Sequence, residues 1–261
     1  MTAPGHLPFV YRRYNRHSTG ACHTHCSTAE KKARVQMKYV RLVMRYVYLM
    51  LGLFVVATGM SLTLEAKLGL ASWTVLQQAV ATRTGLSYGH ATQGVGLVVV
   101  LASMLLGIWP SLATLLNMYF VGYFVDLIRS FAVWPAHPSL VTRLVFLFGG
   151  VLVQGFGVGM YVSADLGAGP RDNLMLGIVR RTHWRVRNVR TSIELGVLIL
   201  GWALGGPIGI GTLALAFLIG PSVELALRLF RKFESWPIVR EVVHVPASAR
   251  AGLPREHGAA G

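Results

Sequence analysis

Cysteine and acidic residues are scarce in this chain of 261 residues. The two cysteines, Cys22 and Cys26, both precede the first long apolar run, so no disulfide can hold the remainder of the chain together. Asp and Glu together number 10, and charged residues make up 13% of the chain against 53% hydrophobic residues. A soluble domain of this size needs far more charge to cover its surface. The composition therefore excludes an ordinary soluble domain and indicates an integral membrane protein.

Recognisable catalytic and metal-binding patterns are also missing. The apolar runs contain no nucleophile–base pair, no His-rich cluster and no phosphate-cradling loop. Cys22-His23-Thr24-His25-Cys26 places four potential ligands close together, but no second set of ligands returns to them as a zinc finger requires. We therefore expect no enzymatic activity, no cofactor and no bound metal.

Basic residues, in contrast, are abundant and give a net charge of +15. Such a charge could indicate a nucleic-acid-binding protein, but the Lys and Arg residues lie beside apolar runs, where they orient a protein in the membrane. We therefore expect the lipid bilayer, and not nucleic acid, as the partner. Residues 1–38 and 231–261 are basic, contain Pro and are predicted to be disordered cytoplasmic tails.

A match without gaps divides the rest of the chain into two halves. Residues 59–127 align with residues 157–225 at a constant offset of 98, and sixteen aligned pairs are identical. Unbroken register of this length indicates a duplicated membrane unit, with a first repeat at 39–131 and a second at 132–230. The identical pairs include Leu68/Leu166, Gly69/Gly167, Arg83/Arg181, Thr84/Thr182, Gly107/Gly205, Thr114/Thr212 and Gly122/Gly220.

Each half is predicted to contain three long membrane spans and one short segment. The short segments, at 72–82 and 170–181, hold only about a dozen residues between polar bounds, well short of the hydrocarbon thickness. The predicted fold is an all-α polytopic membrane protein whose two homologous halves each have three long transmembrane helices and one short interrupted or re-entrant helix. The long spans are predicted at 46–64, 91–108, 111–128, 144–163, 192–204 and 210–227.

The distribution of Lys and Arg predicts the orientation. With the N-terminus inside and six full crossings, 21 of the 25 Lys and Arg residues lie on the inner side, and both termini are cytoplasmic. Three crossings per half also make the two copies inverted, as in many secondary transporters. If the short segments cross as well, there are eight spans and the copies are parallel. Slightly more of the Lys and Arg residues then lie inside, because Arg83, Arg129 and Arg143 move to that side. We favour six crossings because the short segments do not span the bilayer unless protein shields them.

The starts of the short segments are predicted to bind a substrate. Pro170 suits a first helical turn, and Ser72 is a plausible N-cap in the other copy. A helix start leaves backbone N–H groups unpaired, and these groups bind carboxylates and phosphates. Alternatively, Gly and Pro merely end helices, and the charged side chains pair at the interface. The candidate substrate-binding residues are Gly169, Pro170, Arg171, Asp172, Asn173, Ser72, Trp73, Gln77, Arg190 and Glu194.

Three carboxylates near the spans need an explanation of their own. Glu194 lies in an apolar stretch, four residues after Arg190 on the same helix face, so it either couples protons or substrate or forms an interfacial ion pair. Asp126 and Glu224 occupy matching positions in the two copies, and each is followed on the same face by an arginine, Arg129 or Arg228. For these two acids we expect interfacial ion pairs with those arginines.

The motifs of the second copy are similar to those of a known family. Leu166-Gly167-Ala168-Gly169-Pro170-Arg171-Asp172, Arg180-Arg181-Thr182, Gly209-Ile210-Gly211-Thr212 and Ile219-Gly220-Pro221 resemble the YczE/YyaS/YitT family of bacterial integral membrane proteins. The resemblance covers about 39–230, and the first copy departs from it at Ala71-Ser72-Trp73-Thr74. It implies a bacterial cytoplasmic membrane location and no settled activity, although transport is suspected.

These observations favour one function and leave one alternative. We expect a transporter or permease that moves a small anionic or amphipathic solute through a site between the two repeats. The alternative is a membrane scaffold or accessory subunit that transports nothing and binds a partner protein. A homo-oligomer is compatible with either function.

Overall fold

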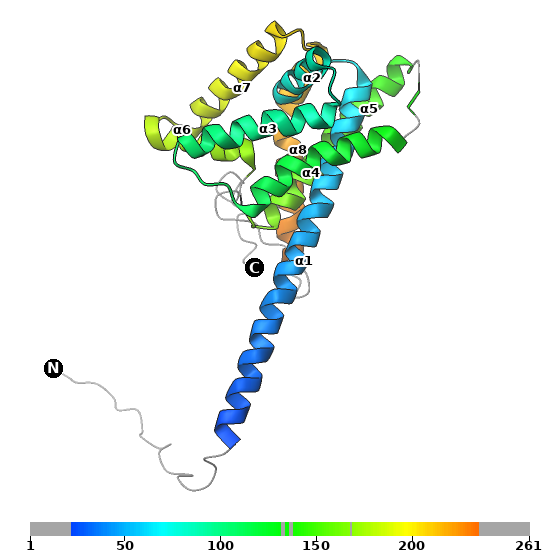
Figure 1. The fold of residues 1–261 in the computed structure, drawn as a ribbon. Coiled ribbons are helices and arrows are strands. Elements are labelled where there is room, and N and C mark those ends of the chain that lie inside the picture. The colour runs from blue at the N-terminus through cyan, green and yellow to red at the C-terminus, as the bar shows by residue number, and fades with distance from the viewer. Residues whose placement is uncertain (1–21, 132–133, 136–137, 168, 235–261) are drawn as a thin grey trace, which may run out of the picture. The chain divides into compact units, whose positions relative to one another are not determined.

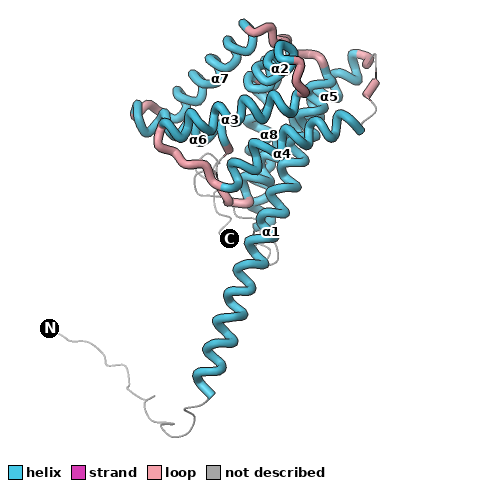
Figure 2. The backbone as a smooth tube through the Cα atoms, in the orientation of Figure 1, coloured by secondary structure: helices cyan, strands magenta, loops and turns pink. Residues whose placement is uncertain are grey.

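A computed structural model describes residues 22–131, 134–135, 138–167 and 169–234 (Figure 1). Within these ranges the chain forms eight helices joined by short connections and no strand, which confirms the predicted all-α class (Figure 2). Residues 22–42 belong to a separate unit, so the packing described below concerns residues from Val43 onward. The helices are α1 (Cys22–Ala66), α2 (Ser72–Thr84), α3 (Tyr88–Leu105), α4 (Leu112–Phe131), α5 (Leu140–Ser163), α6 (Pro170–Thr182), α7 (Val186–Ala203) and α8 (Ile210–Glu234).

Helix α1 begins earlier than the sequence predicts. A disordered tail is expected through residue 38, whereas the structure has helix from Cys22 onward; residues 1–21 and 235–261 lie outside the described ranges. The stretch 21–51 contains neither Gly nor Pro, and 29–36 is rich in the good helix formers Ala, Glu, Lys and Arg. These propensities favour a helix that runs unbroken into the first apolar run.

Five helices of the described part are long and apolar enough to cross a membrane, namely α3, α4, α5, the Val35–Ala66 part of α1 and the Ile210–Phe230 part of α8. Helix α7 has the same length as α3 but carries Arg187, Arg190 and Glu194. It begins at Val186 instead of residue 192, so that the helix includes these charges. The remaining two helices, α2 and α6, have 13 residues each and correspond to the predicted short segments.

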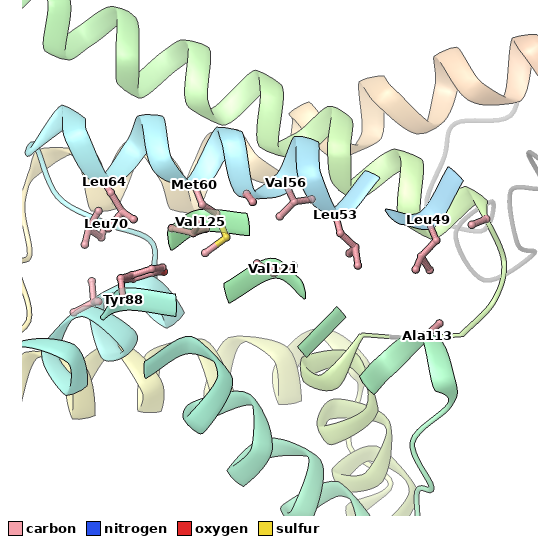
Figure 3. Packing of buried hydrophobic residues seen from close by; sticks show 13 residues of the cluster. Leu49, Leu53, Val56, Met60, Leu64, Leu70, Tyr88, Ala113, Val121 and Val125 are labelled. Atoms are coloured by element: carbon pink, nitrogen blue, oxygen red, sulfur yellow. The ribbon is translucent and has the colours of Figure 1, made fainter. Parts of the chain in front are cut away.

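One face of α1 contributes the centre of an apolar cluster (Figure 3). Its buried side chains recur every three or four residues, which is the period of a helical stripe. The cluster also contains Tyr88 of α3 and Val121 and Val125 of α4, together with Leu70 from the loop after α1. It therefore holds the beginning of α2 beside α3. The buried residues of the stripe are Leu49, Leu53, Val56, Ala57, Met60 and Leu64.

Helices α1 and α5 cross closely and run antiparallel. A Cβ added to Gly157 would lie 2.9 Å from the Gly52 carbonyl oxygen, and one added to Gly150 would lie 2.9 Å from the Gly59 carbonyl oxygen. Along the contact, residue numbers therefore decrease on α5 while they increase on α1, which makes the two helices antiparallel. Only glycine permits backbones to approach this closely, which is the usual role of small residues between membrane helices.

Helices α5 and α8, in contrast, run parallel. A Cβ on Gly155 would lie 2.6 Å from Ser222 Cβ, and one on Gly159 would lie 2.7 Å from Ala226 Cβ, so the numbers of both helices rise together along the contact. Because α6 and α7 connect these two helices, the pair of them must return the chain to the end of the bundle at which α5 began.

Helix and turn positions in the second half follow those of the first half at the sequence offset. Helices α2 and α6 begin 98 residues apart and end 98 residues apart, and α3 and α7 do the same. Helix α2 packs against α7 and α6 packs against α3, so that each short helix contacts the other half (Figure 1). Backbone positions with positive φ also pair at this offset: Lys67/Asp165, Gly69/Gly167, Gly85/His183 and Gly107/Gly205.

Candidate functional site

Helix α6 starts at a Gly-Pro pair. Gly169 is the N-cap, with extended backbone (φ −66°, ψ 166°), and Pro170 follows as the first helical residue, where its missing N–H costs no hydrogen bond. The Asp172 carboxylate turns back and accepts a hydrogen bond from the Gly169 N–H. This is the acidic half of a capping box. The local sequence therefore explains why α6 starts here.

Helix α2 starts differently from the sequence prediction. Ser72 is expected to be the N-cap, but Ala71 holds that position and Ser72 is the first helical residue. The prediction of the cap is wrong because the loop before α2 is held by tertiary contacts. The Leu70 N–H donates to Thr212 Oγ1 at 3.2 Å, at the start of α8. This contact keeps the chain extended through Ala71, where φ is −65° and ψ is 153°.

The first turns of the two short helices meet at Trp73 and Arg171. The guanidinium carbon of Arg171 lies 4.9 Å from the centre of the Trp73 ring, which is a cation–π contact. Both residues are the second residue of their helix, and they lie 98 positions apart. Trp73 Nε1 also donates a hydrogen bond to Glu194 Oε1 on α7, at 3.2 Å. Trp73 thus joins α2 to both α6 and α7.

Three charged side chains, Asp172, Arg190 and Glu194, lie around this contact. Glu194 and Asp172 are both close enough to act electrostatically on Arg171, and Arg190 acts on Asp172. The cluster contains two arginines and two carboxylates, so its formal charge is balanced when no ligand is bound. An anionic ligand at Arg171 would therefore compete with the protein's own carboxylates.

Arg171 is exposed, although the side chains of Trp73, Asp172 and Glu194 lie near it. Trp73, in contrast, is only 5% exposed. The buried Trp73 ring thus lies beside the exposed Arg171. A separate open hollow lies at the other end of α6 and is lined by none of these residues.

Two predicted site residues serve helix packing. Gln77 Oε1 accepts a hydrogen bond from the Tyr88 hydroxyl at 2.7 Å, and Asn173 Nδ2 donates to Thr114 Oγ1 at 3.2 Å. Both side chains are buried, and these bonds link α2 to α3 and α6 to α4. Gln77 and Asn173 thus hold the short helices in place beside the charged cluster.

The ten predicted residues therefore divide into three groups. Ser72, Gly169 and Pro170 form the helix starts, and Gln77 and Asn173 fasten the two short helices. The structure brings the remaining five together in one cluster: Trp73, Arg171, Asp172, Arg190 and Glu194.

Sequence reasoning missed two tyrosines of the cluster. Tyr88 and Tyr161 both lie near Arg171. A Cβ on Gly169 would lie 3.5 Å from the Tyr161 hydroxyl, so this hydroxyl lies at the start of α6. Tyr161 falls inside a predicted span, where a lone hydroxyl gives no periodic or motif signal. Tyr88 precedes its predicted span and is likewise unmarked.

Two arginines at the ends of the short helices form reciprocal contacts. Arg83 Nε donates to the Leu204 carbonyl oxygen at 2.8 Å, and Arg181 Nη2 donates to the Leu105 carbonyl oxygen at 2.7 Å. Each arginine therefore caps the end of a helix from the other half, α7 or α3, where the last carbonyl groups lack helical partners. An arginine thus has the same role at two positions that lie 98 residues apart.

One of the two expected interfacial ion pairs is absent. Asp126 accepts hydrogen bonds from the Gly89 N–H at 2.8 Å and from the Ser87 hydroxyl, so it caps the start of α3. Arg129 instead pairs with Glu65 of α1 at 3.0 Å. The expectation for Asp126 is wrong because the unpaired N–H groups of α3 lie beside it. The second expected pair is present, with Arg228 2.5 Å from Glu224.

The fold places the chain in a broad class. An all-helical body with five long apolar helices is typical of a polytopic membrane protein. Comparisons with known proteins agree with this class and define the family.

Residues 43–228 match the model of a family of unknown function, DUF6198, and the chain belongs to this family. It is 37% identical to the uncharacterized membrane protein YczE of Bacillus subtilis (strain 168), over 79% of this chain and 96% of YczE. It is 34% identical to an uncharacterized protein of Haemophilus influenzae, over 72% and 86% of the two chains. Identity to the uncharacterized protein YyaS of Bacillus subtilis is 26%, over 65% and 86%. The predicted resemblance to YczE and YyaS is confirmed. No solved structure gives a significant match.

Proposed function

We propose that this protein is a transporter of a bacterial cytoplasmic membrane, and that it moves a small anionic or amphipathic solute through a site between two inverted repeats. The observation that carries the proposal is the contact between Trp73 and Arg171, at which the first turns of α2 and α6 meet. Discontinuous helices whose N-termini converge near the midplane form the substrate site in many repeat-built transporters.

The directions of the helices support six crossings. If α2 and α6 crossed the membrane, four crossings would separate the start of α1 from the start of α5, and these helices would be parallel. Their contacts are antiparallel, through Gly52 with Gly157 and Gly59 with Gly150. The same eight-crossing count would make α5 and α8 antiparallel, whereas Gly155 and Gly159 pack on α8 in parallel register. With six crossings the distribution of Lys and Arg favours cytoplasmic termini.

Recurring contacts support two copies related by a twofold axis in the membrane plane. The Gly52–Gly157 contact becomes the Gly59–Gly150 contact when each residue is exchanged for its equivalent at the 98-residue offset. The caps that Arg83 and Arg181 provide exchange to within one residue, since the equivalent of Leu204 is Leu106 and Arg181 donates to Leu105. Because α1 and α5 are equivalent helices that cross antiparallel, the axis relating them lies across the helices. This geometry is expected of inverted repeats.

The groups at the site suit a solute with an acidic group and an apolar part. Arg171 offers an accessible guanidinium, which pairs with carboxylate or phosphate through two hydrogen bonds. The backbone N–H groups in the first turns of α2 and α6 add donors and partial positive charge. The Trp73 ring offers an aromatic wall for the apolar part. Asp172 and Glu194 compensate Arg171 while the site is empty.

Uptake into vesicles tests the proposal. The full chain is reconstituted and assayed with a panel of radiolabelled carboxylates, organic phosphates and amino acids. We expect uptake of at least one anionic compound, and a loss of more than about tenfold in Arg171→Gln, because one charge-assisted pair contributes about 1.5–3 kcal/mol. Arg180→Gln removes the same charge from the same helix and should leave uptake unchanged.

Absence of uptake together with a co-purifying partner would contradict transport. If no compound of the panel is taken up, and a partner protein co-purifies with the wild type but not with Arg171→Gln, the scaffold alternative replaces the transporter. Size-exclusion profiles in detergent must first match between the variants, so that lost uptake reflects the site and not misfolding.

A further inference from the structure

A wide-open hollow of about 760 Å³ lies on the surface of the turn between α6 and α7. Its wall includes Trp184, Arg185, Arg187, Asn188 and Thr191, which come from the turn and the first turns of α7. The hollow lies at the end of α6 opposite to the Trp73–Arg171 contact and shares no residue with it. It is therefore separate from the proposed transport site.

Positive charge is concentrated around this hollow. No acidic residue occurs between Asp172 and Glu194, whereas the same stretch contains Arg180, Arg181, Arg185, Arg187 and Arg190. Two of these arginines already have roles, since Arg181 caps α3 and Arg190 acts on Asp172. Arg185 and Arg187 line the hollow, and their side chains have no hydrogen bond or ion pair within the described part of the chain.

The equivalent turn of the first half shows that this charge is not needed to build the turn. The turn between α2 and α3 lies 98 positions earlier. Its first residue, Gly85, has a left-handed backbone conformation, as His183 does in the turn between α6 and α7. Ser87 and Gly89 stand there at the positions of Arg185 and Arg187. Neutral residues therefore form the equivalent helix–turn–helix, so the two arginines are not needed to build the turn.

The neighbouring tryptophan indicates the environment of the hollow. Trp184 is 59% exposed in the turn before α7, and Trp side chains at the ends of membrane spans lie at the level of the lipid headgroups. Orientation by positive charge would explain arginines at this end of the helices, but it requires neither a hollow nor the Asn188 and Thr191 side chains beside it. A basic hollow at headgroup depth suits a phosphate ester.

We propose that this hollow binds the headgroup of an anionic phospholipid of the cytoplasmic leaflet. Arg185 and Arg187 hold the phosphate, because a guanidinium fork pairs with two of its oxygens. Asn188 and Thr191 provide hydrogen-bonding groups for the polar part of the headgroup, and Trp184 packs beside the glycerol region. The headgroup depth of the hollow and its leaflet both rest on the proposed six-crossing topology, in which α7 crosses the membrane; the lipid site itself does not depend on transport.

Lipid binding to the purified full chain tests the proposal. Phosphatidylglycerol and phosphatidylcholine are titrated separately into the protein in a zwitterionic detergent, and bound lipid is counted by native mass spectrometry. We expect preferential binding of phosphatidylglycerol, and about fivefold weaker binding in Arg187→Gln, since one arginine near an anionic leaflet contributes about 1 kcal/mol. Arg187→Lys should lie between the wild type and Arg187→Gln, because it keeps the charge and loses the fork.

A matched variant separates this site from diffuse attraction. Arg180→Gln removes an exposed arginine of the same stretch that does not line the hollow, and it should leave lipid binding unchanged. An equal loss in Arg180→Gln and Arg187→Gln, or no preference for phosphatidylglycerol, overturns the proposal. Inorganic phosphate that displaces phosphatidylglycerol with equal affinity also overturns it, because the site would then recognise free phosphate. None of these results depends on solute uptake, so they are distinguishable from a failure of the transport assay.

Discussion

Trp73 makes two separable interactions at the candidate site, a hydrogen bond to Glu194 and a ring contact with Arg171. Trp73→Phe removes the first and keeps an aromatic ring for the second. We expect the free energy of unfolding to fall by about 1 kcal/mol, the net contribution of a typical hydrogen bond. The loss is no larger because half-buried Glu194 can form a hydrogen bond with water instead. Chemical denaturation in detergent measures the change. Trp109→Phe, at a side chain that is 78% exposed, is the control and should have no effect. A Trp73→Phe protein as stable as wild type would show that the bond contributes nothing.

Part of the site could be predicted at the scale of single residues. Arg171, Asp172 and Glu194 stand out in the sequence because charges are rare in apolar surroundings and must have partners there. The interaction partners of these charged side chains could not be predicted, because they depend on how α2 packs against α7. Trp73 could be identified only through its position in the repeat, opposite Arg171. Tyr161 could not be identified, since its hydroxyl reaches the start of α6 through tertiary packing alone.

At the scale of helices, the crossing of α1 and α5 depends on glycine. A Cβ at Gly157 would lie 2.5 Å from the Val56 backbone nitrogen and 2.9 Å from the Gly52 oxygen, and neither backbone atom can move without separating the helices. We therefore expect Gly157→Ala to cost about 1–3 kcal/mol, as overpacking usually does. Thermal unfolding in one detergent should show a lower midpoint for this variant.

The matched control for this prediction lies on the same helix. A Cβ at Gly149 meets no atom within 4 Å, so Gly149→Ala should leave the midpoint unchanged or raise it through better helix propensity. If both variants melt at the wild-type temperature, the close approach of α1 and α5 is not required for stability.

Helix positions could be predicted wherever Gly and Pro bound an apolar run. The expected short segment 170–181 differs from α6 by a single residue, because Gly169-Pro170 starts the helix and the chain turns at His183. The start of α7 could not be predicted, because an arginine-rich stretch does not look apolar. The beginning of α1 was missed for a related reason: helix-forming residues continue upstream of the apolar run that defines the span.

At the scale of the whole molecule, the two copies of the repeat can be tested by labelling. Leu86 and Trp184 are equivalent residues of the α2–α3 and α6–α7 turns, and they are 52% and 59% exposed. In a background of Cys22→Ser and Cys26→Ser, we expect a membrane-impermeant maleimide to label Leu86→Cys from outside intact cells. Trp184→Cys should react only in inverted vesicles. Labelling of both positions from the same side would contradict the inverted arrangement and six crossings.

The charges of α7 have a consequence for biogenesis. In the proposed six-crossing topology α7 crosses the membrane with Arg187, Arg190 and Glu194, and it cannot enter lipid unaided, since an Arg or Asp at the centre of a span costs about 2.5–3.5 kcal/mol. Its partner for shielding is α2, which was synthesised more than a hundred residues earlier and whose Leu76 packs against Gly201. Insertion of α7 therefore depends on the first half, which must already be in the membrane. When the ribosome completes α7, this helix inserts by packing against α2, a much earlier part of the same chain.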